Sequence, residues 1–352
     1  MAEIKHNEFC PIPFDEFEIH WNGNVYLCCP AFNNYYSCGN VFENSFDDVW
    51  NSEKAIDFRN KIMNNDYSLC NSEACYLCKS KKFIPDFETS YKAKMEEYPK
   101  KIKLCYDSEC NLACLICRDK IGRLSAEQLE KWNDKIETFL VPMLKDVKVL
   151  TLNAAGEVFA SRHSRKLIKR VTEMYPNIKF EFLTNGTLCN EQTFKDLNIK
   201  PEQIHTIRIS MHAATKKTYS VMVKNGELYY DKLLENLKYL GELKKKYGFL
   251  LYWNFVVTSL NYKDMPKYAA MAKIYNAVPF FWEYRKNQSS QHLENVEIWE
   301  ENHPKHKDFV RVLKHPNMYI FKDCLYPKLK KCQIENPKYS FWERLQLLLN
   351  IY

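Results

Sequence analysis

The chain has 352 residues, of which 46% are hydrophobic and 27% are charged, and this balance excludes a disordered, fibrous or collagen-like chain. Its formal charge of +7 comes from 51 Lys and Arg against 44 Asp and Glu scattered along the chain, which argues against a dedicated nucleic-acid clamp. The first residues lack the apolar core of a signal peptide, and the longest apolar run, residues 249–257, is too short to span a bilayer. We therefore expect a soluble, cytoplasmic protein.

The first 90 residues are expected to form a small Cys-rich α+β module. Residues 17–27 alternate in polarity around the turn signal Asn22-Gly23, which predicts a β-hairpin. A helical segment over residues 46–62 follows, and then a Cys-rich loop. A module this short needs a staple to be stable, and here the staple would be a metal.

From residue 102 onward, short β-rich runs alternate with amphipathic helical stretches. Ser125 is placed to cap one of these helices, with Gln128 as its capping-box partner. Strands that are each followed by a helix predict a parallel sheet, either open and doubly wound or closed into a partial barrel, with ligands at the carboxyl ends of the strands. The predicted strands are residues 102–106, 147–153, 178–184, 205–211, 249–257 and 278–284.

We expect an α/β fold, in which the Cys-rich module precedes either an open sheet or a partial (β/α)6 TIM-like barrel. The predicted domains are residues 1–90 for the module, 91–300 for the barrel and 301–352 for a helical C-terminal extension rich in Lys.

Cysteine is unusually frequent, and eleven of the fourteen cysteines lie between Cys10 and Cys117. A cytoplasm would keep these thiols reduced, so their clustering indicates metal binding or catalysis. The densest group, Cys110-x3-Cys114-x2-Cys117, follows the first predicted barrel strand. A closed zinc site would need a fourth ligand, for which Cys105 is available only within the strand itself.

The spacing of Cys110, Cys114 and Cys117 resembles the signature of radical S-adenosylmethionine (SAM) enzymes. The resemblance implies that these thiols hold a [4Fe–4S] cluster with one iron free to bind SAM, and that an electron from the cluster cleaves SAM to a 5'-deoxyadenosyl radical. It also implies a reducing partner such as a flavodoxin or a ferredoxin.

Companion motifs end the successive strands, as they do in this family. Residues 153–157 resemble a Gly-Gly-Glu motif that binds the methionine amine, with Ala155 replacing one glycine. The resemblance assigns further cofactor contacts to the turn at Asn185 and to the fourth strand's end, and Val256 or Val257 to the adenine site; the carboxylate has only Lys224 as a cation nearby. The full set of expected SAM-binding residues is Gly156, Glu157, Asn185, Ser210, His212, Lys224 and Val257, and His212 is equally well explained as a structural hydrogen-bonding group.

A second set of thiols lies in the N-terminal module. The pattern Cys10-x12-Gly23-x4-Cys28 with a distant Cys75-x2-Cys78 resembles the auxiliary-cluster modules called SPASM and twitch. The resemblance implies one auxiliary [4Fe–4S] cluster on Cys10, Cys28, Cys75 and Cys78, although such modules usually follow the barrel. Cys29, Cys38 and Cys70 are surplus, with Cys70 the first choice as a replacement ligand, and a zinc-stapled hairpin is the alternative interpretation.

The sequence thus predicts a radical SAM enzyme that abstracts hydrogen from a sugar, cyclitol or glycan-related substrate, leading to oxidation or epimerisation. The start of the Cys-rich module at residue 10 leaves no room for a preceding peptide-binding domain, which favours a small molecule over a ribosomal peptide. Modification of such a peptide is the second hypothesis, and a non-enzymatic iron–sulfur or zinc protein is the third. Glu283 and Arg285, after the sixth strand, are candidates for proton transfer and for binding an anionic substrate group, with packing or a surface ion pair as the alternative.

Overall fold

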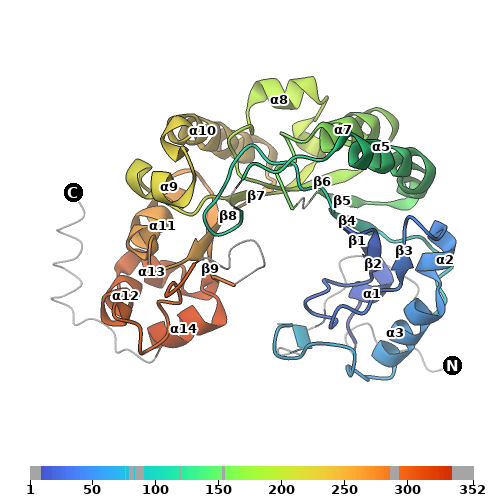
Figure 1. Cartoon of the computed structure of the whole chain (residues 1–352), viewed down its shortest axis with the longest axis horizontal. Coiled ribbons are helices and arrows are strands. Elements are labelled where there is room, and N and C mark those ends of the chain that lie inside the picture. The colour runs from blue at the N-terminus through green and yellow to red at the C-terminus, as the bar shows by residue number, and fades with distance from the viewer. Residues whose placement is uncertain are drawn as a thin grey trace. The chain divides into compact units, whose positions relative to one another are not determined.

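The computed structural model describes residues 9–75, 77–78, 83, 91–118, 120–152, 155–285 and 293–334. Contacts divide the chain into two compact units (Figure 1). Unit 1 contains Met1–Glu109, Arg123–Phe182 and Leu197–His205, and unit 2 contains Cys110–Gly122, Leu183–Asp196 and Thr206–Tyr352. This division follows contacts rather than chain order, so the predicted domains 1–90, 91–300 and 301–352 stay predictions. Among the described residues, we find no helix with the length and apolarity needed to cross a bilayer.

Unit 1 contains a mixed sheet in which the predicted N-terminal hairpin is present. Strand β1 (Glu16–His20) pairs antiparallel with β2 (Asn24–Tyr26), which pairs with β3 (Gly39–Asn40). On its other side, β1 pairs in parallel with β4 (Lys101–Cys105). Strands β5 (Val149–Leu152) and β6 (Lys179–Thr184) continue the parallel series. The Cys-rich hairpin therefore extends the parallel sheet and does not stand alone.

The two faces of this sheet differ in polarity, because successive side chains of a strand point to opposite sides. One face is apolar and fully buried, as at Phe17, Ile102 and Phe180. The other face carries ion pairs: the Lys101 Nζ lies 3.0 Å from a Glu181 carboxylate oxygen, and Lys103 pairs with Glu16. Pairing offsets the cost of removing these charges from water.

The helix signals read from the sequence are largely confirmed in unit 1. Ser125 and Gln128 form the predicted capping box at the start of α5 (Ala126–Lys135). The prediction of one helix over residues 46–62 is wrong in one respect, because Ser52 accepts a hydrogen bond from the Ala55 N–H and starts a second helix. The remaining helices of unit 1 are α1 (Ile12–Asp15), α2 (Phe46–Trp50), α3 (Glu53–Met63), α6 (Val141–Met143) and α7 (Arg162–Met174).

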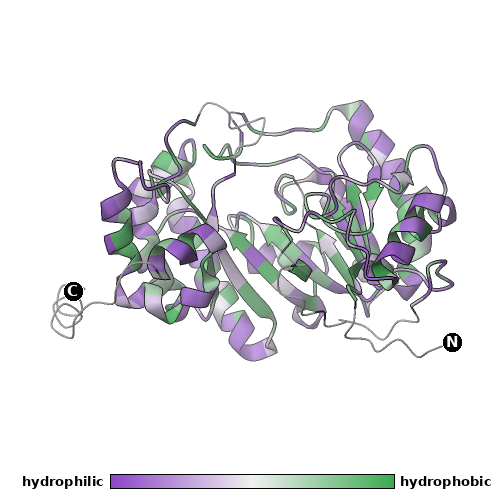
Figure 2. Ribbon diagram, turned by 90° about the horizontal axis from the view of Figure 1, so that it is seen from below, coloured by the Kyte–Doolittle hydropathy of each residue, from purple (hydrophilic) through white to green (hydrophobic). Residues whose placement is uncertain are grey.

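Unit 2 contains the parallel strands β7 (Ile204–Ser210), β8 (Leu250–Val257) and β9 (Val278–Glu283). Helix α10 (Tyr230–Tyr247) packs on β8 and α11 (Met265–Ile274) packs on β9. Most residues of β8 and β9 are hydrophobic, whereas β7 carries more polar residues, as the hydropathy colours of Figure 2 allow the reader to follow. Residues on the helix-covered face are fully buried, whereas those on the opposite face are half-buried. The other helices of unit 2 are α8 (Glu191–Asp196), α9 (Lys216–Met222), α12 (His306–Leu313), α13 (Pro316–Ile320) and α14 (Pro327–Ile334).

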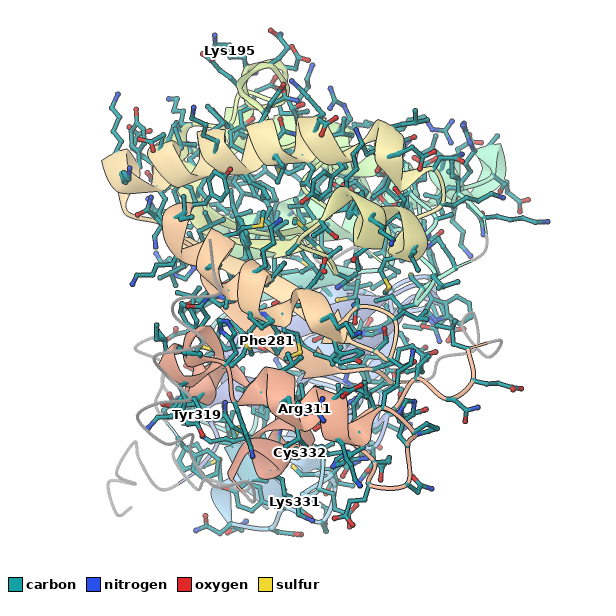
Figure 3. The ribbon with its side chains drawn as sticks, turned by 90° about the vertical axis from the view of Figure 1, so that its left-hand side faces the viewer. Lys195, Phe281, Arg311, Tyr319, Lys331 and Cys332 are labelled. Atoms are coloured by element: carbon teal, nitrogen blue, oxygen red, sulfur yellow. The ribbon has the colours of Figure 1, made fainter. Side chains whose placement is uncertain are left out.

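The C-terminal helices pack beside β9. Helix α14 contacts β9, and the Tyr326 N–H donates to the Phe281 carbonyl at 2.9 Å. Figure 3 labels Phe281 with Arg311, Tyr319 and Cys332 of these helices. Residues 335–352 lie outside the described part of the chain.

The α/β fold class with parallel strands is confirmed. Each predicted barrel strand is present and begins and ends within two residues of its predicted limits. A helix follows each strand, so the carboxyl ends of the strands are where the predicted site residues have to be sought.

Candidate cofactor-binding sites

The loop of Cys110, Cys114 and Cys117 has a defined backbone in unit 2. The N–H groups of Cys117 and Arg118 both donate to the Cys114 carbonyl at 2.9 Å, which places Cys114 and Cys117 on one turn. All three thiols are half-buried. The Leu112 N–H points at the Cys110 sulfur at 3.4 Å, and the Arg118 guanidinium at the Cys117 sulfur at 3.4 Å. These donors favour thiolates, the form that binds metal.

The loop is fixed against the segment after α9. Cys114 forms an isolated antiparallel bridge with Val223, and the Lys224 N–H donates to the Ala113 carbonyl at 3.0 Å. Lys224, the predicted partner of the SAM carboxylate, therefore lies beside the thiol loop with its side chain exposed.

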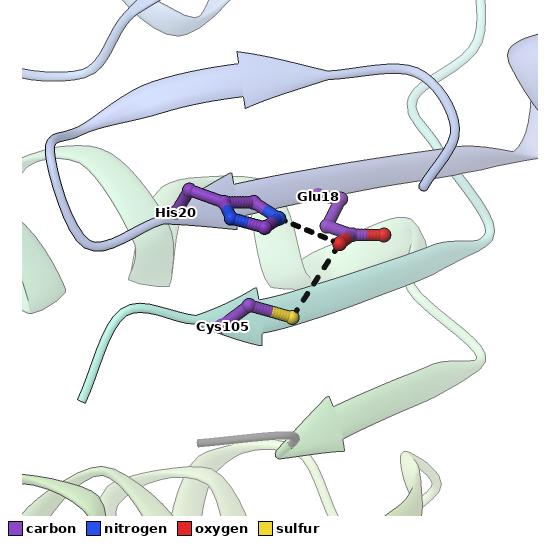
Figure 4. Close-up of side chains that lie close together, drawn as sticks. All are labelled: Glu18, His20 and Cys105. Carbon is purple, nitrogen blue, oxygen red and sulfur yellow. Dashed lines mark hydrogen bonds and ion pairs between the residues drawn. The ribbon is translucent and has the colours of Figure 1, made fainter. Parts of the chain in front are cut away.

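Cys105, the fourth ligand that the zinc alternative would need, contacts side chains of unit 1. Its thiol donates to the Glu18 carboxylate at 3.6 Å, and the same oxygen lies 2.7 Å from Nε2 of His20 (Figure 4). The parallel pairing of β1 with β4 brings these three side chains together in unit 1. Cys105 is thus engaged in a polar cluster of its own strand pair.

Gly156 packs against the residue that precedes the thiol loop. A Cβ at Gly156 would overlap the carbonyl oxygen of Glu109, and the Glu157 N–H donates to that oxygen at 2.6 Å. The Glu157 carboxylate is fully buried and accepts the Phe159 N–H at 3.2 Å. The predicted motif therefore needs its glycine for close backbone approach. Asn153 and Ala154 of this motif lie outside the described residues.

We expect Gly156→Ala to destabilise the protein by about 3 kcal/mol, since the added methyl group meets backbone that cannot move aside cheaply. Thermal unfolding followed by circular dichroism measures the loss. Gly248→Ala is the matched control: Gly248 has φ +78° but open space around it, so only about 1 kcal/mol of backbone strain is expected. Equal losses in the two variants would contradict the steric explanation.

The turn at Asn185 is hydrogen-bonded to the thiol loop. The Asn185 amide donates to Asn111 at 2.9 Å, and the Asn111 amide donates to the Thr187 hydroxyl at 2.9 Å. Asn236 of α10 donates to the carbonyls of Gly186 and Thr187. Asn111, Thr187 and Asn236 were not singled out from the sequence, and the only signal was the place of Asn111 between Cys110 and Cys114.

The predicted SAM-binding residues at the ends of β7 and β8 differ in which face of the sheet they occupy. Ser210 ends β7 and is half-buried. Nδ1 of His212 accepts the Val256 N–H at 3.1 Å, and burial lowers the pKa of His212 to about 4, so the imidazole is neutral near pH 7. Val257 is fully buried on the helix-covered face, whereas Val256 is half-buried on the opposite face. Of the two valines, Val256 is therefore the one on the face that carries Ser210.

Glu283 and Arg285 have partners in the C-terminal segment. The Glu283 carboxylate accepts the Lys328 N–H at 2.6 Å near the start of α14. Arg285 is exposed and donates to the Tyr326 hydroxyl at 3.1 Å. Both contacts fit the packing alternative, and the catalytic roles of these residues stay a prediction.

Four of the N-terminal thiols influence one another, namely Cys10, Cys70, Cys75 and Cys78, and the ligand set of Cys10, Cys28, Cys75 and Cys78 stays a prediction. Burial raises the pKa of the Cys10 thiol, and the nearby thiols of Cys75, Cys70 and Cys78 raise it further. Burial and the neighbouring Cys75 and Cys70 raise the pKa of Cys78 to about 12. Burial raises the pKa of the Cys28 thiol, and the nearby Cys10 thiol raises it further. Buried thiols held this close cannot all ionise without a cation, so the donor set fits a metal cluster that supplies positive charge.

The surplus thiols separate clearly. Cys70 joins the group, because its thiol is hydrogen-bonded with that of Cys78. Burial raises the pKa of Cys38 to about 12, but its charged neighbours are Arg59 and Lys54. Burial raises the pKa of Cys29, and its charged neighbours are Glu18 and Lys103. All fourteen cysteines are free thiols.

The geometry of these thiols agrees with a family match over the same stretch. Residues 10–79 match the family model SPASM, described as an iron-sulfur cluster-binding domain. The chain carries a SPASM domain. This match confirms the N-terminal SPASM module recognised from the sequence, and together with the Cys110 loop it is consistent with the resemblance to radical SAM proteins.

Two relatives align with part of the chain, and both are named FeMo cofactor biosynthesis protein NifB. The protein from Methanocaldococcus jannaschii is 26% identical over 154 residues, covering 40% of this chain and 49% of the relative. The protein from Methanocaldococcus infernus is 25% identical over 135 residues, covering 36% of this chain and 43% of the relative. The chain thus spans about half the length of these relatives or less.

Solved structures with a similar arrangement include two described with bound SAM. Streptococcus suis SuiB bound to S-adenosylmethionine aligns with a TM-score of 0.44 and 14% identity, covering 92% of this chain and 74% of that one. Native anSMEcpe with bound AdoMet aligns with a TM-score of 0.38 and 21% identity, covering 63% and 59% respectively.

The SPASM domain is held together by a buried arginine. Arg59 of α3 is fully buried and donates to the carbonyls of Pro13, Trp50 and Ala93 at 2.8–3.2 Å. Its guanidinium also stacks over the Trp50 ring at 4.1 Å. Burial lowers the pKa of Arg59 to about 9. Arg59 therefore joins two segments of the SPASM domain, at Pro13 and Trp50, to the chain at Ala93 that follows it.

We expect Arg59→Ala to cost about 3 kcal/mol or more of unfolding free energy, because it leaves buried carbonyls unpaired and opens a cavity. Chemical denaturation and iron content per chain measure the effect, and both are expected to fall. Lys61→Ala on the same helix removes only a surface ion pair with Asp66 and serves as the control. A stable Arg59→Ala protein with full iron content would refute this role.

Proposed function

We propose that this protein is a radical SAM enzyme that abstracts a hydrogen atom from a sugar, cyclitol or other glycan-related substrate. Cys110, Cys114 and Cys117 would hold a [4Fe–4S] cluster, and the SPASM thiols would hold an auxiliary cluster. When bound, the first cluster supplies the electron that cleaves SAM to methionine and the hydrogen-abstracting 5'-deoxyadenosyl radical. Oxidation or epimerisation of the substrate would follow.

One observation carries the proposal: three half-buried thiols lie on a short loop whose backbone and Arg118 are arranged to favour thiolates. A hydrogen bond from the Asn185 amide to Asn111, and one from the Asn111 amide to Thr187, fix this loop to the turn that follows β6. The chain's own residues thereby set the positions of the sulfur atoms before any cluster binds.

The residues proposed to bind SAM would make different kinds of contact with it. Gly156 gives close approach to backbone, and the neutral His212 keeps Nδ1 occupied by the Val256 N–H, so its Nε2 edge is the one left to face a ligand. Lys224 offers a positive charge beside the thiol loop for a carboxylate.

The auxiliary site is supported by the gathering of Cys10, Cys28, Cys75 and Cys78 within residues that match the SPASM model. The raised pKa values of Cys10, Cys28 and Cys78 mean that these three thiols are protonated at neutral pH when no metal is bound. Cluster binding would therefore release protons and stabilise the fold.

The experiment is an assay of the anaerobically reconstituted protein for 5'-deoxyadenosine, with SAM and dithionite, and with a flavodoxin or a ferredoxin as the natural type of reductant. Formation of 5'-deoxyadenosine that requires both SAM and reductant supports the proposal. No product above the reductant-free reaction overturns it and leaves a non-enzymatic iron–sulfur protein. Adding sugars or a candidate peptide and following product mass then separates the substrate classes.

A further inference from the structure

The half-buried face of the unit 2 sheet is lined by aromatic rings and polar side chains. Parallel pairing places Arg208 beside Tyr252, and Ser210 beside Asn254. The same face continues onto β9 with Phe280 and Trp282. This face is opposite the one covered by α10 and α11, and its residues keep partial exposure.

Arg208 is unusual among the cations of the two sheets. In unit 1, Lys101 and Lys103 are each paired with a carboxylate. Within the described part of the chain, the Arg208 guanidinium has neither an ion-pair partner nor a hydrogen-bond acceptor, and its contact is the Tyr252 ring at 4.5 Å. A half-buried guanidinium has paid part of its desolvation cost without a counter-ion, so an anion from outside the chain would be bound favourably.

The neighbouring groups extend this site beyond a single charge. The Trp282 indole N–H donates to the side-chain oxygen of Asn254 at 3.1 Å, which leaves the Asn254 amino group as a donor. Tyr252 and Phe280 have ring centroids 5.5 Å apart, and Phe280 and Trp282 have centroids 6.3 Å apart. Aromatic faces with a few directed donors are the usual composition of a site for a small ring-bearing molecule.

We propose that Arg208 binds an oxyanion of the substrate, while Tyr252, Phe280 and Trp282 contact its ring and Asn254 donates to a hydroxyl group. The substrate class is therefore an anionic sugar, with a phosphate or a carboxylate as the charged group. This inference rests on the proposed function, because it takes the occupant of this face to be the enzyme's substrate.

Calorimetric titration of the cluster-loaded protein under anaerobic conditions tests the proposal with four probes: glucose 1-phosphate, glucuronate, glucose and inorganic phosphate. We expect at least one anionic sugar to bind about tenfold or more tightly than glucose. The preferred anion identifies phosphate or carboxylate. Binding of neither anionic sugar, or equal binding of glucose, would overturn the proposal.

Two substitutions separate the charge from the rings. Arg208→Gln is expected to weaken binding of the preferred anionic sugar and of inorganic phosphate by about tenfold. Arg208→Lys should bind with intermediate affinity, because it keeps the charge but loses the planar arrangement of donors. Trp282→Ala is expected to weaken binding of the sugar but not binding of inorganic phosphate. Arg311→Gln, which removes an exposed arginine of α12 paired with Asp308, is the control and should bind like the unmodified protein. Thermal unfolding of each variant checks that it is folded.

Two further results would refute the assignment. One is an Arg208→Gln protein that binds every probe as the unmodified protein does. The other is an Arg208→Gln protein whose affinity for SAM falls as much as its affinity for the anionic sugar, which would assign Arg208 to the cofactor's carboxylate. The titrations do not require cleavage of SAM. A protein that forms no 5'-deoxyadenosine but still prefers anionic sugars would therefore contradict the proposed function and leave the anion site intact.

Discussion

Cys114→Ala is expected to abolish formation of 5'-deoxyadenosine, by about a thousandfold or more, because a cluster held by two thiols is lost or misplaced. Cys114 begins the turn that carries Cys117, and its bridge to Val223 fixes the loop. The measurement is chromatographic quantification of 5'-deoxyadenosine after anaerobic reconstitution with SAM and dithionite.

Cys324→Ala is the matched control for this variant. Cys324 is also a half-buried free thiol of unit 2, but it lies in the C-terminal segment, away from the loop of Cys110 in the sequence. It should keep full activity and full iron content. A Cys114→Ala protein as active as Cys324→Ala would show that the loop does not hold the cluster.

The double variant Cys75→Ala/Cys78→Ala is expected to lose about four of the roughly eight irons that two four-iron clusters require. Both thiols are buried within the SPASM domain, and loss of two ligands from one cluster leaves too few for stable binding. Iron and sulfide determinations measure the loss, and the remaining iron should still give the absorption of one cluster. Retention of all iron would refute the ligand choice.

Cys38→Ala provides the control, since Cys38 is buried in the same domain but lies beside Arg59 and Lys54. It should keep all its iron. Cys70→Ala tests the addition made by the structure: the predicted ligand set of Cys10, Cys28, Cys75 and Cys78 requires that this variant also keep its iron. Loss of about four irons from Cys70→Ala would replace one predicted ligand by Cys70.

The strands and the thiol motifs were predictable because they depend on local order in the chain. A period of two in polarity marks a strand, and the spacing of Cys110, Cys114 and Cys117 fixes how far apart their sulfur atoms can lie. The single predicted helix over residues 46–62 failed for an equally local reason, since Ser52 competes for backbone N–H groups and starts a new helix.

The partners of particular side chains were not predictable. Val256 and Val257 are neighbours of similar chemistry, and only the orientation of β8 decides which one is covered by helices. Glu283 and Arg285 follow a strand in the way that site residues often do, yet Lys328 and Tyr326, some forty residues later, supply their contacts.

The sequence by itself determined the order of strands and helices along the chain and the two groups of thiols. Tertiary structure alone decided that Cys105 contacts Glu18 and that Arg208 lies over Tyr252 without a carboxylate, and it favoured Cys70 over the other surplus thiols. For Cys105 and Arg208 the physical reason is strand register, because a shift by one residue would move these side chains to the other face of their sheets. Cys70 lies in a loop, where the packing of the loop decides its neighbours.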